Sequence, residues 1–329
     1  MQARTLALGL IGIAAALLAG TMATNVAVDP EAVFGTHPNA VRVNANSRYQ
    51  RYVAYRDARE HPDGVIFASS RGNGFDLGDL ARALGVASVA NFSFTYGMIP
   101  DHLPTLEYLL RDKAARGERL KSVLLMLDAD HFGKVPWTNT NLDGFLPPEV
   151  SGEHPARFWW RYLTAFQLRV WVATIRGVPG RRADAPARTP VVPAGMLPRV
   201  TLPDISALRL AARPQRQYDI VLRPQLDAHL AMLARFAALC RQHDVQLTVV
   251  TSPLNRLNAR DYDPAELAGV VARISRVVPL WDFGMPDWLS ERGELWTDPS
   301  HFTPEVARMM LERIFGTAGR PDFGTLRGG

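Results

Sequence analysis

The sequence predicts an α/β protein built on a doubly wound parallel sheet, preceded by a transmembrane helix and interrupted by a helical or irregular insertion. Three observations predict this fold. Short apolar runs alternate with helical patterns along most of the chain, an uncharged segment lies near the N-terminus, and the alternation stops between residues 137 and 224. Continuous apolar strands are typical of parallel sheets that helices cover on both faces. With 329 residues and 47% hydrophobic content, the chain can bury a sizeable core.

Residues 1–28 are predicted to be a membrane anchor or a signal segment. Thr5–Val28 contains no charged residue, and a helix of this length can cross a bilayer. Arg4 before the segment and acidic residues after it favour an N-terminus inside the cell. Thr21-Met22-Ala23 is a fair cleavage site, but the apolar stretch exceeds a usual signal core. We therefore expect a single-pass inner-membrane anchor, with the main domain, residues 29–329, in the periplasm or otherwise outside the cytoplasm.

The alternating pattern gives the expected elements of the main domain in order. Residues 29–62 are polar and turn-rich. The first strand follows, and helices then alternate with strands until a last helix that Thr303 caps, with Pro304 in its first turn. Sheets of this kind bind ligands at the carboxyl ends of their strands. The expected strands are 65–68, 86–92, 122–127, 245–250 and 277–283, and the expected helices are 76–84, 101–116, 225–243, 264–276 and the last one from 304.

The predicted insertion, residues 137–224, carries aromatic residues at helical spacing from Phe158 to Ile175, with arginines between them and prolines after them. Basic and aromatic residues on one helix suit a lid or a membrane-surface helix. Aromatic stripes are more often packing surfaces, which is the interpretation that we favour. The net charge of +5 and pI of 9.6 permit an anionic polymer or lipid as partner. Nucleic acid is not expected, because no binding motif accompanies the charge.

Two short motifs indicate chemistry. The first strand runs into Ser69-Ser70-Arg71-Gly72, a turn that would expose a serine hydroxyl at the strand's carboxyl end, with the Ser70 N–H available to an oxyanion. The last strand is followed by Asp298-Pro299-Ser300-His301. A nucleophilic serine needs a base, and the base needs a carboxylate that fixes its tautomer. These motifs predict Ser70 as nucleophile, His301 as base and Asp298 as the residue that orients His301.

Together the two motifs resemble the SGNH, or GDSL-like, hydrolase superfamily, in which a serine turn follows the first strand and an Asp-x-x-His motif closes the chain. The resemblance covers most of residues 26–316 and is nearest to a group of membrane-anchored bacterial envelope proteins. That group includes alginate-type O-acetyltransferases and the protein that moves D-alanine onto teichoic acids. The matching segments are Val28-Asp29-Pro30, Phe34-Gly35, Ala68-Ser69-Ser70-Arg71 and Asp298–Phe302.

The resemblance implies a flavodoxin-like sheet and an exported serine esterase or O-acyltransferase that acts on an ester of a cell-envelope or extracellular polysaccharide. It implies no cofactor, and it adds a membrane protein that donates acyl groups as an expected partner. Gly97, which follows Asn91, would lend a second N–H to the oxyanion hole. Arg71 and Asn91 would contact substrate. Topology alone, without the resemblance, adds Asn255 and Arg256 as expected substrate contacts, because they follow a strand end at the ligand-facing edge of the sheet.

The sequence departs from this superfamily at two places. Ala68 stands where a glycine is usual, and Asp128-Ala129-Asp130-His131 stands where an asparagine donor is usual. Loss of one oxyanion donor typically costs roughly a hundred- to a thousandfold in rate. These departures leave room for a non-catalytic envelope protein that binds polysaccharide or takes part in assembly.

The segment Asp128–His131 raises two further alternatives. A phosphatase of the haloacid dehalogenase type would use Asp128 and Asp130, with Thr251 or Ser252 as its second motif, but it needs a threonine where Phe132 stands and a later lysine that the chain lacks. A metal site is not expected, because neighbouring side chains on an extended segment point to opposite faces. We expect these residues to form structural hydrogen bonds.

Overall fold

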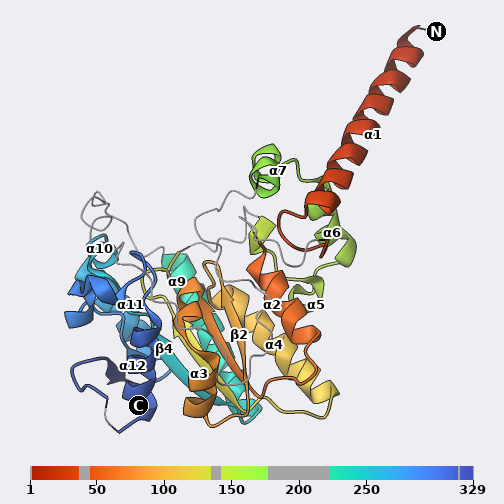
Figure 1. Cartoon of the computed structure of the whole chain (residues 1–329). Helices are drawn as coiled ribbons and strands as arrows, with labels where there is room; N and C mark the ends of the chain where they lie inside the picture. The colour runs from red at the N-terminus through yellow and green to blue at the C-terminus, as the bar shows by residue number, and fades with distance from the viewer. Residues whose placement is uncertain (1, 37–44, 135–141, 177–222, 318, 329) are drawn as a thin grey trace. The chain divides into compact units, whose positions relative to one another are not determined.

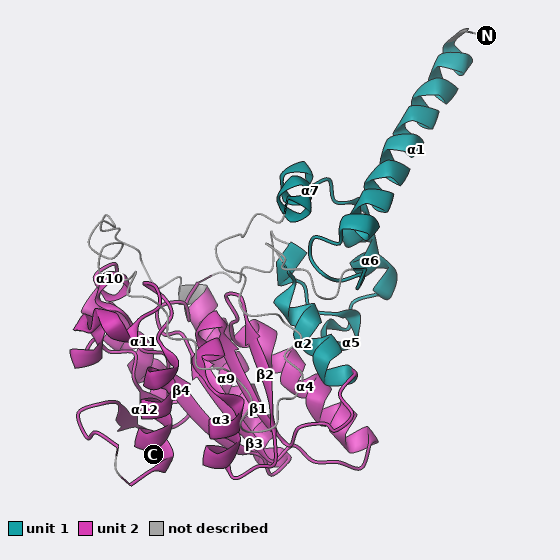
Figure 2. Ribbon diagram, in the orientation of Figure 1, with its two compact units in different colours: residues 1–56, 137–189 teal, residues 57–136, 190–329 magenta. Residues whose placement is uncertain are grey.

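The structure is a computed structural model that describes residues 2–36, 45–134, 142–176, 223–317 and 319–328. The chain divides into two compact units (Figure 2). Unit 1 contains residues 1–56 and 137–189, and unit 2 contains residues 57–136 and 190–329. The first part of the predicted insertion therefore folds together with the N-terminal segment. Residues 177–222 of the insertion lie outside the described part of the chain.

Unit 2 is an α/β unit around a six-stranded sheet, as the apolar runs predict (Figure 1). The strand order is β2-β1-β3-β4-β5-β6, and the neighbours from β2 to β5 are parallel. β6 pairs antiparallel with β5. Its three residues are exposed and carry no apolar pattern, so the sequence did not predict it. The strands are β1 (Gly64–Ser69), β2 (Val89–Phe94), β3 (Ser122–Leu127), β4 (Gln246–Thr251), β5 (Leu280–Asp282) and β6 (Thr325–Arg327).

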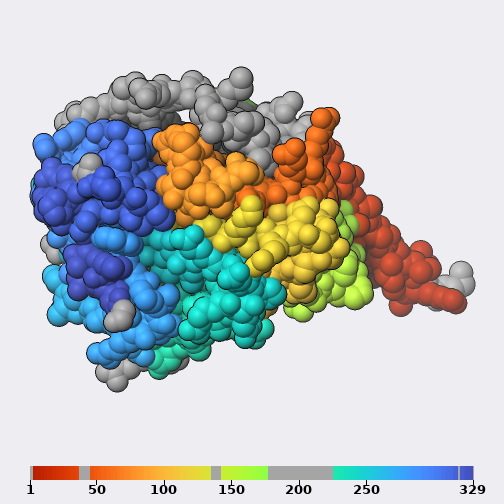
Figure 3. Space-filling model, turned by 90° about the horizontal axis from the view of Figure 1, so that it is seen from below, coloured from red at the N-terminus to blue at the C-terminus, as the bar shows by residue number. Residues whose placement is uncertain are grey.

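Helices cover both faces of this sheet. Phe67 of β1 contacts Phe236 of α9 on one face, where α4 and α9 pack side by side (Figure 3). Its neighbour Ile66 points to the opposite face and joins a cluster with Met310 of α12. The helices of unit 2 are α3 (Leu77–Leu84), α4 (Ile99–Ala115), α9 (Arg223–Gln242), α10 (Arg256–Ala259), α11 (Pro264–Ser275) and α12 (Pro304–Phe315), with 3-10 turns η1 (Ser70–Gly74), η4 (Trp288–Glu291) and η5 (Gly293–Leu295).

β2 and β5 each begin three residues later than predicted, because the residues before them belong to turns. The Val86 N–H bonds back to the Ala81 carbonyl at the end of α3, and Ser88 donates to the Asp63 carboxylate, so β2 starts at Val89. Before β5, the Val278 N–H donates to Ile274 at the end of α11. Apolar composition alone does not separate such turn residues from a strand.

Unit 1 begins with α1 (Gln2–Val28), which is long and apolar enough to cross a membrane, and none of its most apolar window is buried. A signal sequence would share these properties. The predicted helix Phe158–Ile175 is two helices, because Ala165 has extended backbone angles. α2 lies within residues 29–62, which were predicted to be polar and turn-rich. The further elements are α2 (Ser47–Arg56), η3 (Leu142–Gly144), α5 (Pro148–Ser151), α6 (Pro155–Thr164) and α7 (Leu168–Ile175).

Asp29, in the motif that follows α1, organises a tight turn. Its φ is +47°, a left-handed conformation that Asp tolerates better than most residues. Its buried carboxylate accepts hydrogen bonds from the backbone N–H groups of Val33, Phe34 and Gly35, at 2.8, 3.0 and 2.9 Å. The turn therefore depends on an acceptor side chain at position 29.

Candidate active site

Ser70 lies where β1 ends and η1 begins, at the carboxyl edge of the sheet. The side chain of the preceding Ser69 caps η1 by accepting a hydrogen bond from the Arg71 N–H at 3.3 Å. This cap leaves the half-buried Ser70 hydroxyl directed to the loop before α12. There the Ser70 Oγ lies 2.8 Å from His301 Nε2, which is 231 positions away in the sequence.

His301 is held in turn by Asp298. Its Nδ1 lies 2.7 Å from Asp298 Oδ2, while Asp298 Oδ1 accepts the backbone N–H groups of Ser300 and His301 at 2.7 and 2.9 Å. Burial acts to raise the pKa of Asp298, but the His301 side chain and these N–H donors hold it below the usual value. An ionised Asp298 places the imidazole proton on Nδ1 and leaves Nε2 to accept the Ser70 proton.

Arg71 connects the two segments that carry this pair. It is 4% exposed, and its guanidinium forms a two-pronged contact with Asp130 at 3.0 and 3.2 Å. The same Nη1 lies 3.3 Å from Asp128, and Nε donates to the Ser300 carbonyl at 3.0 Å. The end of β1, the end of β3 and the His301 loop are therefore joined through one side chain.

Arg71 favours the ionised form of the two aspartates that follow β3, Asp128 and Asp130. Burial acts to raise the pKa values of Asp128 and Asp130, but the charge of Arg71 holds both below their usual range. His131 lies 3.6 Å from Asp128 and 3.5 Å from Asp130. Arg71 Nη1 contacts both carboxylates, and no group of three metal-ligating side chains in the described ranges is suited to hold an ion.

Two of the residues expected to contact substrate are buried instead. Arg71 is enclosed by its acidic partners, so it supports the site from within. Asn255 is 1% exposed and caps α10, with its Oδ1 accepting the Leu257 N–H at 2.9 Å. Arg256 is exposed and lies 3.3 Å from Glu291. Only Arg256 of these three presents a side chain to solvent.

Gly97 and Asn91 also differ from their expected roles. The Gly97 N–H donates to the Phe94 carbonyl at 2.9 Å, so in this conformation it is engaged within a turn rather than offered to an oxyanion. Asn91 lies inside β2 opposite Ile66, and its Oδ1 accepts the Ser93 N–H at 2.8 Å. Its Nδ2 donates to Asn73 Oδ1 at 3.4 Å, so the side chain supports η1, the turn that begins at Ser70.

Three residues that the sequence did not single out support the site. Asn258 donates to the Ser300 Oγ at 3.2 Å, and Tyr262 donates to Asp130 Oδ2 at 3.4 Å. Lys134 donates to the Tyr262 hydroxyl at 2.8 Å. Asn258 lies in α10 and Tyr262 just after it, in the segment that follows β4, and only their place at the ligand-binding edge of the sheet could have indicated them.

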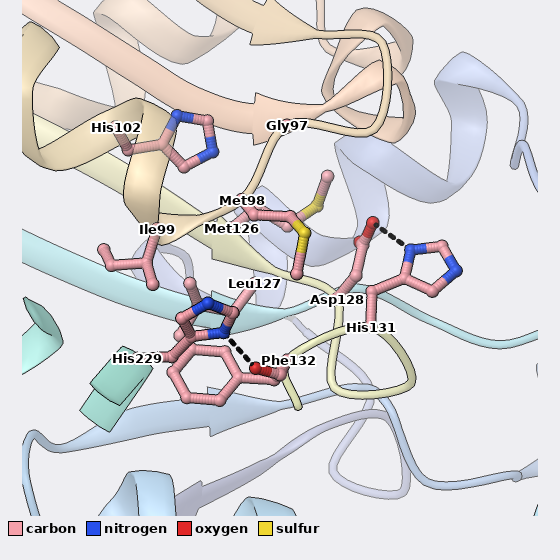
Figure 4. Close-up of a pocket in the computed structure, with 10 residues that line it drawn as sticks. All are labelled: Gly97, Met98, Ile99, His102, Met126, Leu127, Asp128, His131, Phe132 and His229. Carbon is pink, nitrogen blue, oxygen red and sulfur yellow. Dashed lines mark hydrogen bonds and ion pairs between the residues drawn. The ribbon is translucent and has the colours of Figure 1, made fainter. Parts of the chain in front are cut away.

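A small pocket opens beside Asp128 and His131 at the carboxyl ends of β2 and β3 (Figure 4). His131 and Asp128 lie at one side of the pocket, and His229, which bonds the Phe132 carbonyl, lies at another. Burial lowers the pKa of His229. Apolar side chains fill most of the wall between them. The lining residues are Gly97, Met98, Ile99, His102, Met126, Leu127, Asp128, His131, Phe132 and His229.

Neither a known protein-family model nor a curated protein matches this sequence. A function for the chain therefore has to follow from the chemistry of its own residues.

Proposed function

We propose that this chain is an exported serine esterase or O-acyltransferase of the SGNH type. The observation that carries the proposal is the continuous contact from Ser70 Oγ to His301 Nε2 at 2.8 Å and from His301 Nδ1 to Asp298 at 2.7 Å. Nucleophile, base and orienting carboxylate in that sequence are what acyl transfer through a serine requires.

The reaction has two halves. His301 Nε2 accepts the Ser70 proton while Oγ attacks the ester carbonyl, and the alcohol then leaves with the proton from His301. His301 next removes a proton from water or a sugar hydroxyl, which attacks the acyl-Ser70 ester and releases the serine. Asp298 stays ionised and stabilises the imidazolium in both halves.

The sheet supports the SGNH assignment. The order β2-β1-β3-β4-β5 corresponds to the 2-1-3-4-5 order of flavodoxin-like sheets. Ser70 follows β1 in that order, at the edge where such sheets bind their ligands. An envelope polysaccharide ester as substrate follows from the motif resemblance, and α1 would hold the site outside the cytoplasm at the membrane.

Oxyanion stabilisation would be the weak part of this site. The Ser70 N–H at the start of η1 is our proposed donor. Gly97 would have to release the Phe94 carbonyl before it could contribute, and Asp130, ionised beside Arg71, can only accept hydrogen bonds. We therefore expect slow turnover.

A fluorophosphonate probe tests the proposal, because it reacts with activated serines. The wild-type chain should be labelled, Ser70→Ala should abolish labelling, and Ser275→Ala, at the end of α11, should retain it. Labelling that persists in Ser70→Ala would contradict the assignment. Product analysis with acetylated and D-alanylated polymers, with and without a sugar acceptor, then separates hydrolysis from transfer.

A second candidate function is non-catalytic binding of polysaccharide or of an assembly partner at the carboxyl edge of the sheet. It is favoured by the Gly97 N–H, which is bonded to the Phe94 carbonyl and so is not offered to an oxyanion. This alternative predicts no labelling of wild type but retained polysaccharide binding. A phosphatase is disfavoured, since Arg71 occupies both aspartates and the Thr251 hydroxyl donates to Asp282 at 2.8 Å.

A further inference from the structure

α7 exposes an apolar stripe within unit 1. Leu168, Val172 and Ile175 recur at helical spacing on one face, and they are 56%, 37% and 71% exposed. Phe166, just before the helix, is 71% exposed. Large apolar side chains gathered on one short helix mark a surface that contacts something other than water.

On one side of this stripe, α7 is held to α1, the helix that is long and apolar enough to cross a membrane. Trp171 is buried, and its Nε1 donates to Asn25 Oδ1 at 2.7 Å. Asn25 Nδ2 in turn donates to the carbonyls of Leu163 and Ala165, both at 2.9 Å. α7 and the link that precedes it are therefore fixed to α1 at the level of residue 25.

That level corresponds to the boundary of a bilayer. The twenty residues Thr5–Thr24 rise about 30 Å as a helix, which equals the thickness of the hydrocarbon core. Asn25 is the next residue, and it is the first polar side chain of α1 to be fully buried in protein. If α1 crosses the membrane, α7 lies where the hydrocarbon meets the headgroups.

The composition of α7 suits this position. Arg169 and the C-cap residue Arg176 are exposed, and they lie about two turns apart along one flank of the apolar stripe. Exposed Trp160 lies on the adjacent helix α6. Arginines beside an apolar face favour anionic headgroups, and tryptophan is enriched at the membrane interface.

We propose that α7 is an interfacial helix whose Leu168–Val172–Ile175 stripe is inserted in the outer surface of the bilayer that α1 crosses. The partner is an anionic lipid surface. The contact restricts the tilt of unit 1 relative to the membrane plane, which one crossing helix alone would leave free. This proposal is independent of acyl transfer and depends on α1 being in the membrane.

Fluorescent labels on single cysteines test it in the full chain, reconstituted into vesicles of phosphatidylethanolamine and phosphatidylglycerol. An environment-sensitive dye is placed on Val172→Cys, with Leu17→Cys in α1 as the lipid control and Arg119→Cys in unit 2 as the water control. Cys240 is buried, so the wild-type chain provides the labelling blank. Quenching by spin-labelled lipid is compared with quenching by aqueous iodide.

The label at position 172 should behave as the one at 17, with lipid quenching severalfold stronger and iodide quenching severalfold weaker than at 119. Ile175→Cys should repeat this result, and adding Val172→Asp should make position 175 more accessible to iodide.

Free access of iodide to position 172 overturns the proposal. Shielding from both quenchers also overturns it, because a second copy or a protein partner would then cover the stripe. A label at 17 that stays in water removes its premise and overturns it too.

Discussion

Arg71 and Asp130 form a buried two-pronged ion pair, with Nη1–Oδ1 at 3.0 Å and Nη2–Oδ2 at 3.2 Å. Arg71 is the neighbour of Ser70, and its Nε bonds the carbonyl of Ser300, the neighbour of His301. The pair therefore helps to set the separation of the Ser70 and His301 side chains without touching either of them. Several predictions about the site depend on this arrangement or on the groups around it.

Asp130→Asn should lower the free energy of unfolding by about 3 kcal/mol, at the lower end of the range for breaking a buried pair, since Asp128 still faces Arg71. It should also slow probe labelling, because the His301 loop loses its fixed distance from Ser70. Urea unfolding measures the first effect. Asp79→Asn, which breaks the exposed pair with Arg82, is the control and should change the stability by less than about 1 kcal/mol. Equal losses of unfolding free energy in the two variants would show that the buried Asp130 pair stabilises the protein no more than the exposed pair does.

Asp298→Asn should reduce the rate of probe labelling by about 10⁴-fold, the effect seen when an orienting aspartate is replaced in a serine triad. The amide cannot hold the imidazole in the tautomer that leaves Nε2 as acceptor. Ser300→Ala is the matched control within the same loop and should lower the rate far less, because it removes the supporting Oγ contact to Asn258 but leaves the His301 tautomer unchanged. A time course of labelling for the three proteins measures the effect, and a wild-type rate in Asp298→Asn would exclude Asp298 from the proposed triad.

Gly97→Ala should destabilise unit 2 by about 1–3 kcal/mol and lower Ser70 reactivity. An added Cβ would lie 2.6 Å from the Ala68 carbonyl oxygen, so the end of β1 or the turn after β2 must move. Gly269→Ala in α11 meets nothing within 4 Å and should stabilise the chain by about 0.5–1 kcal/mol. Urea unfolding of both variants gives the comparison, and a neutral Gly97→Ala would refute the steric argument.

Glu31 should make unit 1 less stable as pH rises. Burial raises its pKa from 4.5 to about 7, although Gln167 donates a hydrogen bond to it. Below about pH 4.5 both folded and unfolded chains hold the proton. Between pH 4.5 and about 7 only the folded chain keeps it, so the free energy of unfolding falls by about 3 kcal/mol across that window and stays lower above it.

Glu31→Gln should remove this pH dependence, because a neutral amide can still accept the bond from Gln167. Thermal unfolding midpoints at about pH 5 and about pH 8, compared with those of wild type, measure the effect. Glu149→Gln, at an exposed position in α5 of the same unit, should leave the wild-type dependence unchanged. The same slope in wild type and Glu31→Gln would assign the pH dependence to other groups.

The sequence predicted the elements whose signal is apolar periodicity. The run Ser122–Leu127 matches β3 residue for residue, because a fully buried strand needs an unbroken apolar run. The approach of Ser70 to His301 followed from the rule that strand ends of a parallel sheet share one edge. The missed helix α2 buries polar side chains beside its apolar ones, so the apolar periodicity that marks a helix is interrupted. The buried residues are Arg48, Gln50, Arg51, Tyr52, Val53 and Tyr55.

The support of the site was harder to predict. Arginine is rarely buried, and a sequence does not show that Arg71 would find two carboxylates and a carbonyl in the interior. The engagement of the Gly97 N–H depends on a backbone turn that no side chain signals. Both features arise from tertiary contacts between segments that are far apart in the chain.

The discontinuous make-up of unit 1 has a consequence for biosynthesis. Asn25 finds its partners at residues 163–171, and Asn46 donates to the Phe145 carbonyl and to the Tyr162 hydroxyl. As the polypeptide is synthesised, the contacts of Asn25 and Asn46 cannot form until their partners, which lie 99 to 146 residues further along the chain, have been made. The first three strands of unit 2 are complete by then. Asn25 is among the first residues to be synthesised, yet its contacts to α6 and α7 can form only after β1, β2 and β3 of unit 2 have been made.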